Sequence, residues 1–187
     1  NIQLTYEIQE ALNEPDIIVS AVASPYTRET AHTVAQFVKP GQVIVNVGKG
    51  IEEATLYTLT EIISDEISTA DVAVLSGPSH AEEVSRLIPT TCVVGAKSLK
   101  TATMIQDAFM SESFRVYTSP DVIGIELGGS LKNVIALAAG MADGLGFGDN
   151  TKAALMTRGI AEISRLGVKM GGRVETFAGL SGIGDLI

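Results

Sequence analysis

Lys132 lies within an unusually apolar stretch that runs from Gly124 to Gly148. A helix that is apolar on nearly all sides belongs in a protein interior, where an unpaired ammonium group is costly. Gly128 and Gly129 precede Lys132 by about one turn and share its face, which leaves a notch for a ligand or another backbone. The pattern favours a lysine that points into a small-molecule site. These residues leave open a second interpretation, a lysine at the edge of a packed helix that extends into solvent.

Further polar positions follow the predicted buried strands. Short β-branched runs predict strands that end before Ser24, Lys49 and Gly77. In an open parallel sheet, ligands bind beyond the carboxyl ends of the strands. Lys49 lies between two glycines and can reach a ligand there, or it is a solvated lysine in a turn. Ser79 is spaced from Glu82 as in a capping box, so it caps a short helix whose free N–H groups could also bind an anion.

Asp185 is a lone acid in an apolar run near the end of the sequence. It is either a helix cap or a carboxylate that orients a lysine or a substrate hydroxyl, and the sequence does not choose between the two. His32 and His80 are the only histidines, and neither has a second ligand at a useful spacing. We therefore expect no metal site.

The order of the elements predicts a doubly wound α/β sheet, with its first strands parallel, followed by an all-helical part. Strands are predicted at 16–23, 43–47, 72–75, 91–95 and 114–117, and helices at 28–38, 52–67 and 98–110, with a short helix after Ser79. After Pro120 the strand pattern ends, and helices are predicted at 121–144 and 150–166. We expect a domain boundary near Pro120, which divides the chain into residues 1–120 and 121–187.

The composition excludes several classes of partner. The net charge of −9 argues against a nucleic-acid partner or an acidic membrane surface. Neither a signal peptide nor an apolar run long enough to span a bilayer is found. The single cysteine, Cys92, lies in an apolar run and is predicted to be a buried, inert thiol, which is compatible with the cytosol.

Four motifs, taken in order, resemble those of the NAD(P)-dependent glycerol-3-phosphate dehydrogenases of the bacterial type. They are VNVGKGIE at 45–52, LSGPSHAEEV at 75–84, the long stretch at 126–167 and FAGLSGIGDLI at 177–187. The resemblance implies a Rossmann-like dinucleotide-binding domain, of which 1–120 is the C-terminal portion, and an all-helical substrate domain that starts at 121–187. No GxGxxG motif is present. In the family, that loop would precede Asn1, and an arginine-asparagine motif would follow Ile187. We therefore expect an incomplete sheet and an internal piece that is inactive alone.

The resemblance also implies roles for individual residues. Lys132 matches the family's proton-transfer lysine, which touches the reacting oxygen of the substrate. Asn133 matches the asparagine beside that lysine and is expected to help position the substrate. Asp185 matches an acid that lines the substrate site.

On the sheet side, Lys49 matches the lysine of the KGI motif, between cofactor and substrate. Gly77 and Ser79 match positions that contact the substrate, and Ala81 one that contacts the cofactor. Tyr26 falls where the family often has an aromatic or apolar residue near the cofactor.

The activity implied is hydride transfer between NADPH or NADH and dihydroxyacetone phosphate, which gives sn-glycerol 3-phosphate for phospholipid synthesis in the cytoplasm. The sequence does not choose between the two cofactors, and a homodimer is left open. Two alternatives also stay open. One is a related dehydrogenase of the 3-hydroxy acid and 6-phosphogluconate superfamily. The other is a truncated paralogue that only binds.

Overall fold

The computed structural model describes residues 2–187. The chain forms two compact units, of which the first ends at Ala73 and the second comprises Val74–Ile187. Strand β3 (Asp71–Ser76) runs through this division. The division lies well before the predicted boundary near Pro120, which stays a prediction about the domains of the protein.

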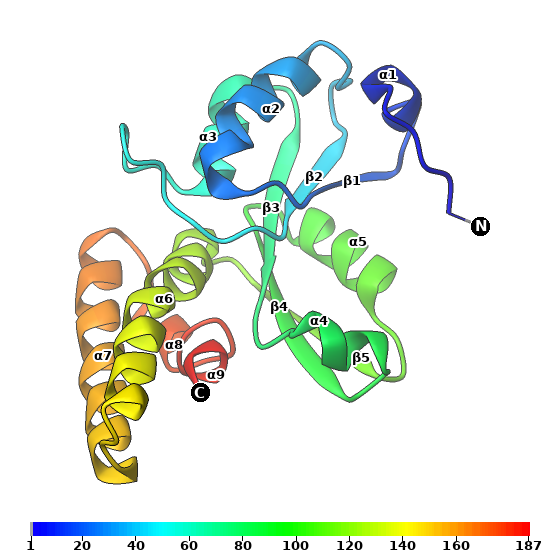
Figure 1. Cartoon of the computed structure of the whole chain (residues 1–187). Coiled ribbons are helices and arrows are strands. Elements are labelled where there is room, and N and C mark those ends of the chain that lie inside the picture. The colour runs from blue at the N-terminus through cyan, green and yellow to red at the C-terminus, as the bar shows by residue number, and fades with distance from the viewer. Residues whose placement is uncertain (1) are drawn as a thin grey trace. The chain divides into compact units, whose positions relative to one another are not determined.

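The first unit is an α/β unit with a parallel pair of strands (Figure 1). Its elements, in chain order, are α1 (Ile8–Ala11), β1 (Ile17–Ser20), the 3₁₀ turn η1 (Ser24–Tyr26), α2 (Thr27–Ala35), β2 (Val43–Asn46) and α3 (Leu59–Glu66). β2 lies between β1 and β3. The register of the first pair runs from Ile17 opposite Val43 to Ser20 opposite Asn46. Strand positions and the parallel direction were both predicted from the sequence.

Apolar side chains of α2, of α3 and of the residues that follow each helix form the core of the first unit against β2. Its buried members are Ala31, Val38, Ile44, Ile63 and Ile67. α2 and α3 lie side by side in Figure 1, as their contacts require. Within residues 2–187, β1 has a neighbouring strand on one side only. A largely apolar cavity of about 200 Å³ lies beside it and is lined in part by Ile18, Val19 and Val34.

The second unit begins with the end of β3 and continues the α/β pattern. α4 (Ala81–Ser85), β4 (Thr90–Ala96), α5 (Leu99–Phe109) and β5 (Phe114–Ser119) follow. β4 lies between β3 and β5 and pairs with β5 in parallel, from Thr90 opposite Phe114 to Gly95 opposite Ser119. The side chain of Gln106 on α5 donates a hydrogen bond of 2.7 Å to the main-chain oxygen of Val116, which fixes the helix to β5.

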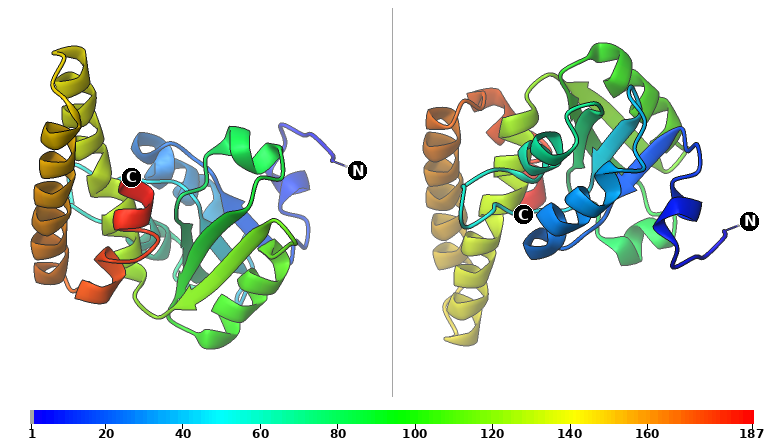
Figure 2. Two further views of the ribbon diagram at one scale, coloured as in Figure 1. Left: turned by 90° about the horizontal axis from the view of Figure 1, so that it is seen from below. Right: turned by 90° about the horizontal axis from the view of Figure 1, so that it is seen from above.

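Four helices complete the second unit: α6 (Val122–Gly144), α7 (Asp149–Lys169), α8 (Val174–Phe177) and α9 (Ile183–Leu186). Figure 2 shows α6 and α7 as a long pair, with α8 and α9 beside α6. The ring of Phe177 is buried under α7, where a Cβ on Gly167 would lie 2.0 Å from it. An α/β sheet followed by a helical part is the fold class that the sequence predicts.

Two predicted helix starts are wrong. The helix predicted from Glu52 begins at Leu59, because Thr58 takes the N-cap position and its main-chain nitrogen donates a hydrogen bond of 2.8 Å to the carboxylate of Glu61. The short helix after Ser79 has His80 at its N-cap, and no side chain caps it. Ser79 instead donates its hydroxyl hydrogen to the main-chain oxygen of Gly77, over 3.2 Å.

Helix α6 also differs from the expectation of an all-round buried helix. Its first turns are buried from Gly124 to Gly129, whereas Val134, Leu137 and Met141 are exposed. By length and composition alone, α6 is long and apolar enough to cross a membrane, so the prediction that no such run exists is wrong on that criterion. The same criterion is met by core helices of soluble proteins, and the absence of a membrane partner stays a prediction.

Candidate functional site

Lys132 on α6 and Asp185 on α9 form an ion pair between segments 53 residues apart. The ammonium Nζ donates one hydrogen bond of 2.9 Å to the main-chain oxygen of Asp185 and a second to its carboxylate Oδ1. The side chain of Lys132 is 18% exposed and that of Asp185 is 5% exposed. Lys132 therefore does not extend into solvent as a lysine at a helix edge would, and Asp185 orients a lysine, as one of its two predicted roles requires.

Gly128 lets the α9 segment approach α6 one turn before Lys132. A Cβ on Gly128 would lie 2.4 Å from the main-chain oxygen of Ser181. The notch predicted from the glycines is therefore filled by another stretch of backbone. A similar restriction holds at Gly182, whose Cβ would lie 2.0 Å from the main-chain oxygen of Phe177. These two close approaches bring Asp185 within reach of the lysine.

Asp121 fixes the start of α6 to the α8 segment. Its buried carboxylate accepts hydrogen bonds from the main-chain nitrogens of Gly124 (3.0 Å) and Arg173 (2.8 Å) and from the hydroxyl of Thr176. It thus caps α6 and holds the segment that leads to α9. The sequence predicted α6 to start at this residue, but nothing in it indicated the two bonds to residues more than 50 positions away.

Lys49 lies in the first unit, in the loop after β2, between two constrained glycines. The side chain of Asn46 brackets Gly48, donating to its oxygen (3.0 Å) and accepting from its nitrogen (3.1 Å). Gly50 has a φ of +154°, and a Cβ there would lie 2.4 Å from the Cβ of Ser24. The loop at the carboxyl end of β2 therefore has a fixed path on both sides of Lys49.

Gly77, Ser79 and Ala81 follow β3 in the second unit. Gly77 has a φ of +144°, and its missing Cβ faces the backbone of Cys92 at 3.1 Å, so a larger residue is excluded there. Cys92 is buried, as predicted. Ser79 and Ala81 are exposed. Their functional roles stay predictions.

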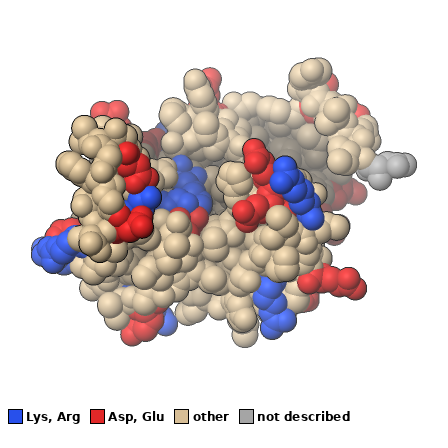
Figure 3. All heavy atoms as spheres, turned by 60° about the horizontal axis from the view of Figure 1, so that its bottom comes forward, with Lys and Arg blue, Asp and Glu red and all other residues tan. Residues whose placement is uncertain are grey.

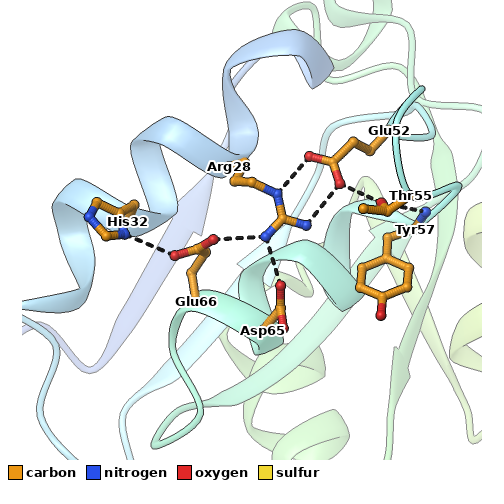
Figure 4. Close-up of polar contacts among 7 residues, drawn as sticks. All are labelled: Arg28, His32, Glu52, Thr55, Tyr57, Asp65 and Glu66. Atoms are coloured by element: carbon orange, nitrogen blue, oxygen red, sulfur yellow. Dashed lines mark hydrogen bonds and ion pairs between the residues drawn. The ribbon is translucent and has the colours of Figure 1, made fainter.

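A charged cluster around Arg28 was not singled out by the sequence (Figure 4). The guanidinium of Arg28, on α2, donates to both oxygens of Glu52 (2.7 and 2.8 Å), to Asp65 (2.7 Å) and to Glu66 (2.7 Å). Nδ1 of His32 lies 3.0 Å from the other oxygen of Glu66. The only local signal was the spacing of Arg28 and His32, which places them on one face of a helix.

Hydrogen bonds within this cluster lower the pKa of two of its carboxyl groups. The pKa of Glu52 is lowered from 4.5 to about 2, because Arg28 and then Thr55 donate hydrogen bonds to its carboxylate. The pKa of Glu66 is also lowered, first by Arg28 and then by His32. Both carboxylates are therefore held in the charged form.

Charges of both signs are mixed on one face of the molecule. On the face drawn in Figure 3, blue Lys and Arg side chains lie scattered among red Asp and Glu side chains. Among residues 2–187, no group of three or more His, Cys, Asp or Glu side chains could hold a metal ion.

A parallel sheet with crossover helices, followed by a helical region, places this chain among proteins with a Rossmann-like fold. Family models described as the N-terminus and the C-terminus of NAD-dependent glycerol-3-phosphate dehydrogenase match residues 1–102 and 121–187. The chain belongs to this family.

Named relatives agree with this assignment. The chain is 65% identical to the glycerol-3-phosphate dehydrogenase [NAD(P)+] of Agathobacter rectalis and 58% identical to that of Fusobacterium nucleatum, in each case over 100% of the chain and 56% of the relative. It therefore spans about half the length of these relatives. The structure of glycerol-3-phosphate dehydrogenase from Coxiella burnetii matches 96% of the chain and 55% of its own, with a TM-score of 0.92 and 34% identity.

Two glycines of α6 provide a matched test of the close approach to α9. In the intact protein, Gly128→Ala is expected to destabilise the fold by about 1–3 kcal/mol, because its Cβ would meet the backbone of Ser181 at 2.4 Å. A Cβ on Gly140 would have no other atom within 4 Å, so Gly140→Ala is expected to stabilise the fold by roughly 0.5–1 kcal/mol. Urea unfolding measures both, and equal effects of the two substitutions would contradict the proposed packing.

The Arg28 cluster predicts an acid-dependent loss of stability. The unfolded state binds a proton on Glu52 near pH 4.5 and the folded state only near pH 2, so its stabilisation is present above pH 4.5 and disappears as the pH falls to about 2. We expect the melting temperature of the wild type to exceed that of Glu52→Gln at pH 6 and the two to converge towards pH 2.5. Parallel curves from pH 6 to 2.5 would show that Glu52 is not held by Arg28 in solution.

Proposed function

We propose that the intact protein interconverts dihydroxyacetone phosphate and sn-glycerol 3-phosphate with NADH or NADPH. Family membership over both parts of the chain supports the reaction class. The single structural observation that carries the proposal is the enclosed pair of Lys132 and Asp185, since a lysine with a fixed direction is what a proton donor requires.

Lys132 is the proposed proton donor. Reduction of the carbonyl at C2 builds negative charge on its oxygen, and a neighbouring ammonium group stabilises this charge and then donates a proton. The nicotinamide cofactor, when bound, supplies the hydride. Asp185 accepts two of the hydrogen bonds that Nζ can donate, which leaves one for the oxygen of the substrate. Asp185 thus sets the direction in which the remaining proton points.

The loops after the strands fit an anionic dinucleotide and an anionic substrate. Lys49 lies just after the carboxyl end of the parallel strand β2, where ligands of such sheets bind. The backbone on both sides of Lys49 is restricted, at Gly48 by Asn46 and at Gly50 by Ser24. In this proposal, Lys49 contacts both cofactor and substrate, Ala81 contacts the cofactor, and Gly77, Ser79 and Asn133 contact the substrate. Tyr26, which is exposed, lies near the cofactor.

The proposed product feeds phospholipid synthesis, and we place the protein in the cytoplasm. A buried Cys92 as the single cysteine is compatible with that compartment. A homodimer stays a prediction. The paralogue that only binds is disfavoured, because an enclosed lysine–carboxylate pair is costly to keep without a use.

Replacing the lysine tests the role directly. In the intact protein, Lys132→Met is expected to lower kcat by at least about 10²-fold, because the proton donor is lost, and to change the dissociation constant of NADPH or NADH less than about twofold. The measurements are oxidation of the reduced cofactor with dihydroxyacetone phosphate and titration of cofactor fluorescence.

Lys152→Met is the matched control, because Lys152 on α7 also pairs with an acid, Asp143, at 2.8 Å, but its side chain is 39% exposed, against 18% for Lys132. Its kcat should equal that of the wild type. If Lys132→Met keeps more than a tenth of the wild-type kcat, Lys132 is not the proton donor.

A further inference from the structure

Arg28 and Glu52 form a bidentate contact that fixes the orientation of both side chains. Nε and Nη2 of Arg28 donate parallel bonds of 2.7 and 2.8 Å to the two oxygens of Glu52. Such a bidentate pair fixes direction as well as distance. The side chains of Arg28 and Glu52 are 31% and 18% exposed, so the pair is partly shielded from water. Isolated surface ion pairs add little stability, which leaves geometry as the more informative property of this contact.

Glu52 also anchors the loop that contains it. Its main-chain nitrogen donates to the oxygen of Tyr57, and its main-chain oxygen accepts from the nitrogen of Leu56, both over 2.9 Å. Ile51 and Thr58 form an antiparallel bridge across the same loop. The hydroxyl of Thr55 donates to the Glu52 carboxylate. Glu52 thus closes this loop through its main chain, while its carboxylate joins the loop residue Thr55 to Arg28 on α2.

Lys49 lies only three residues before Glu52, and η1 and α2 contact the chain on that side at one point each. The first is Ser24, against which Gly50 is packed without room for a Cβ. The second is Arg28, which holds Glu52. On the other side, Asn46 brackets Gly48. The backbone on both sides of Lys49 is thus held by regular elements, β2 on one side and η1 with α2 on the other.

We propose that Arg28 is a positioning residue for Lys49, which it holds in place through Glu52. Asp65 and Glu66 on α3 accept hydrogen bonds from the remaining guanidinium nitrogen, Nη1, and so fix Arg28 itself. The kinetic consequence rests on the proposed function, in which Lys49 contacts cofactor and substrate. The mechanical consequence, an ordered loop at residues 47–53, does not.

The first test measures amide hydrogen exchange of the intact protein by mass spectrometry. Arg28→Lys keeps the charge but cannot form the two parallel bonds. We expect exchange at residues 47–53 to become faster by about tenfold, because local opening becomes easier, while exchange in β2 (Val43–Asn46) stays unchanged. Lys39→Met, which breaks an exposed ion pair with Glu14 (side chains 60% and 77% exposed), is the control and should change neither segment. Unchanged exchange at 47–53, or equally faster exchange in β2, would overturn the proposal.

The second test is a double-mutant cycle on turnover. Arg28→Lys is expected to raise KM for dihydroxyacetone phosphate by about fivefold or more, with a smaller effect on kcat, because a displaced Lys49 binds the anion less well. In a Lys49→Met background the same substitution should change KM less than about twofold. An equal effect in both backgrounds would show that Arg28 does not act through Lys49. If the wild type does not reduce dihydroxyacetone phosphate, the proposed function fails, and hydrogen exchange alone decides on the positioning role.

Discussion

The ion pair between Lys132 and Asp185 depends on the close packing of α6 against the segment that carries α9. An ammonium group that is mostly shielded from water needs a partner, and here the partner supplies both a carboxylate and a main-chain oxygen. Gly128 and Gly182 make this possible, since a methyl group at either position would collide with backbone. The proposed role of Lys132 therefore depends on glycine at positions 128 and 182, where a side chain would keep Asp185 away from the lysine.

In both units, polar side chains hold in place the segments that lead to residues of the proposed site. In the second unit, Asp121 fixes the start of α6 and the α8 segment through three hydrogen bonds. In the first unit, Asn46 and the Arg28–Glu52 contact fix the loop that contains Lys49. In each case polar side chains order a segment that serves the proposed site. The loop of the first unit carries Lys49, and the α8 segment of the second unit leads to α9, which carries Asp185. A buried or bidentate hydrogen-bonding group suits this purpose because it restricts direction.

Local pattern was sufficient to predict most strands, the parallel pairing and Lys132 as an unusual lysine. It was not sufficient for the start of α3, where Leu56 fitted the helical spacing but lies exposed in a loop with a φ of +62°. The capping box formed by Thr58 and Glu61 was present in the sequence and is the stronger signal. Arg28 could not be recognised, because its three acids lie 24 to 38 residues away in two other segments and periodicity reports only on near neighbours. For the same reason Asp185 could be given two alternative roles, and only the structure shows that it orients a lysine.

The most direct measurement is a crystal structure of the intact protein with dihydroxyacetone phosphate and the oxidised cofactor. The account predicts that Nζ of Lys132 lies within about 3.2 Å of the C2 oxygen while it still bonds to Asp185. A structure in which another group donates to that oxygen, with Lys132 turned away from the substrate, would contradict it.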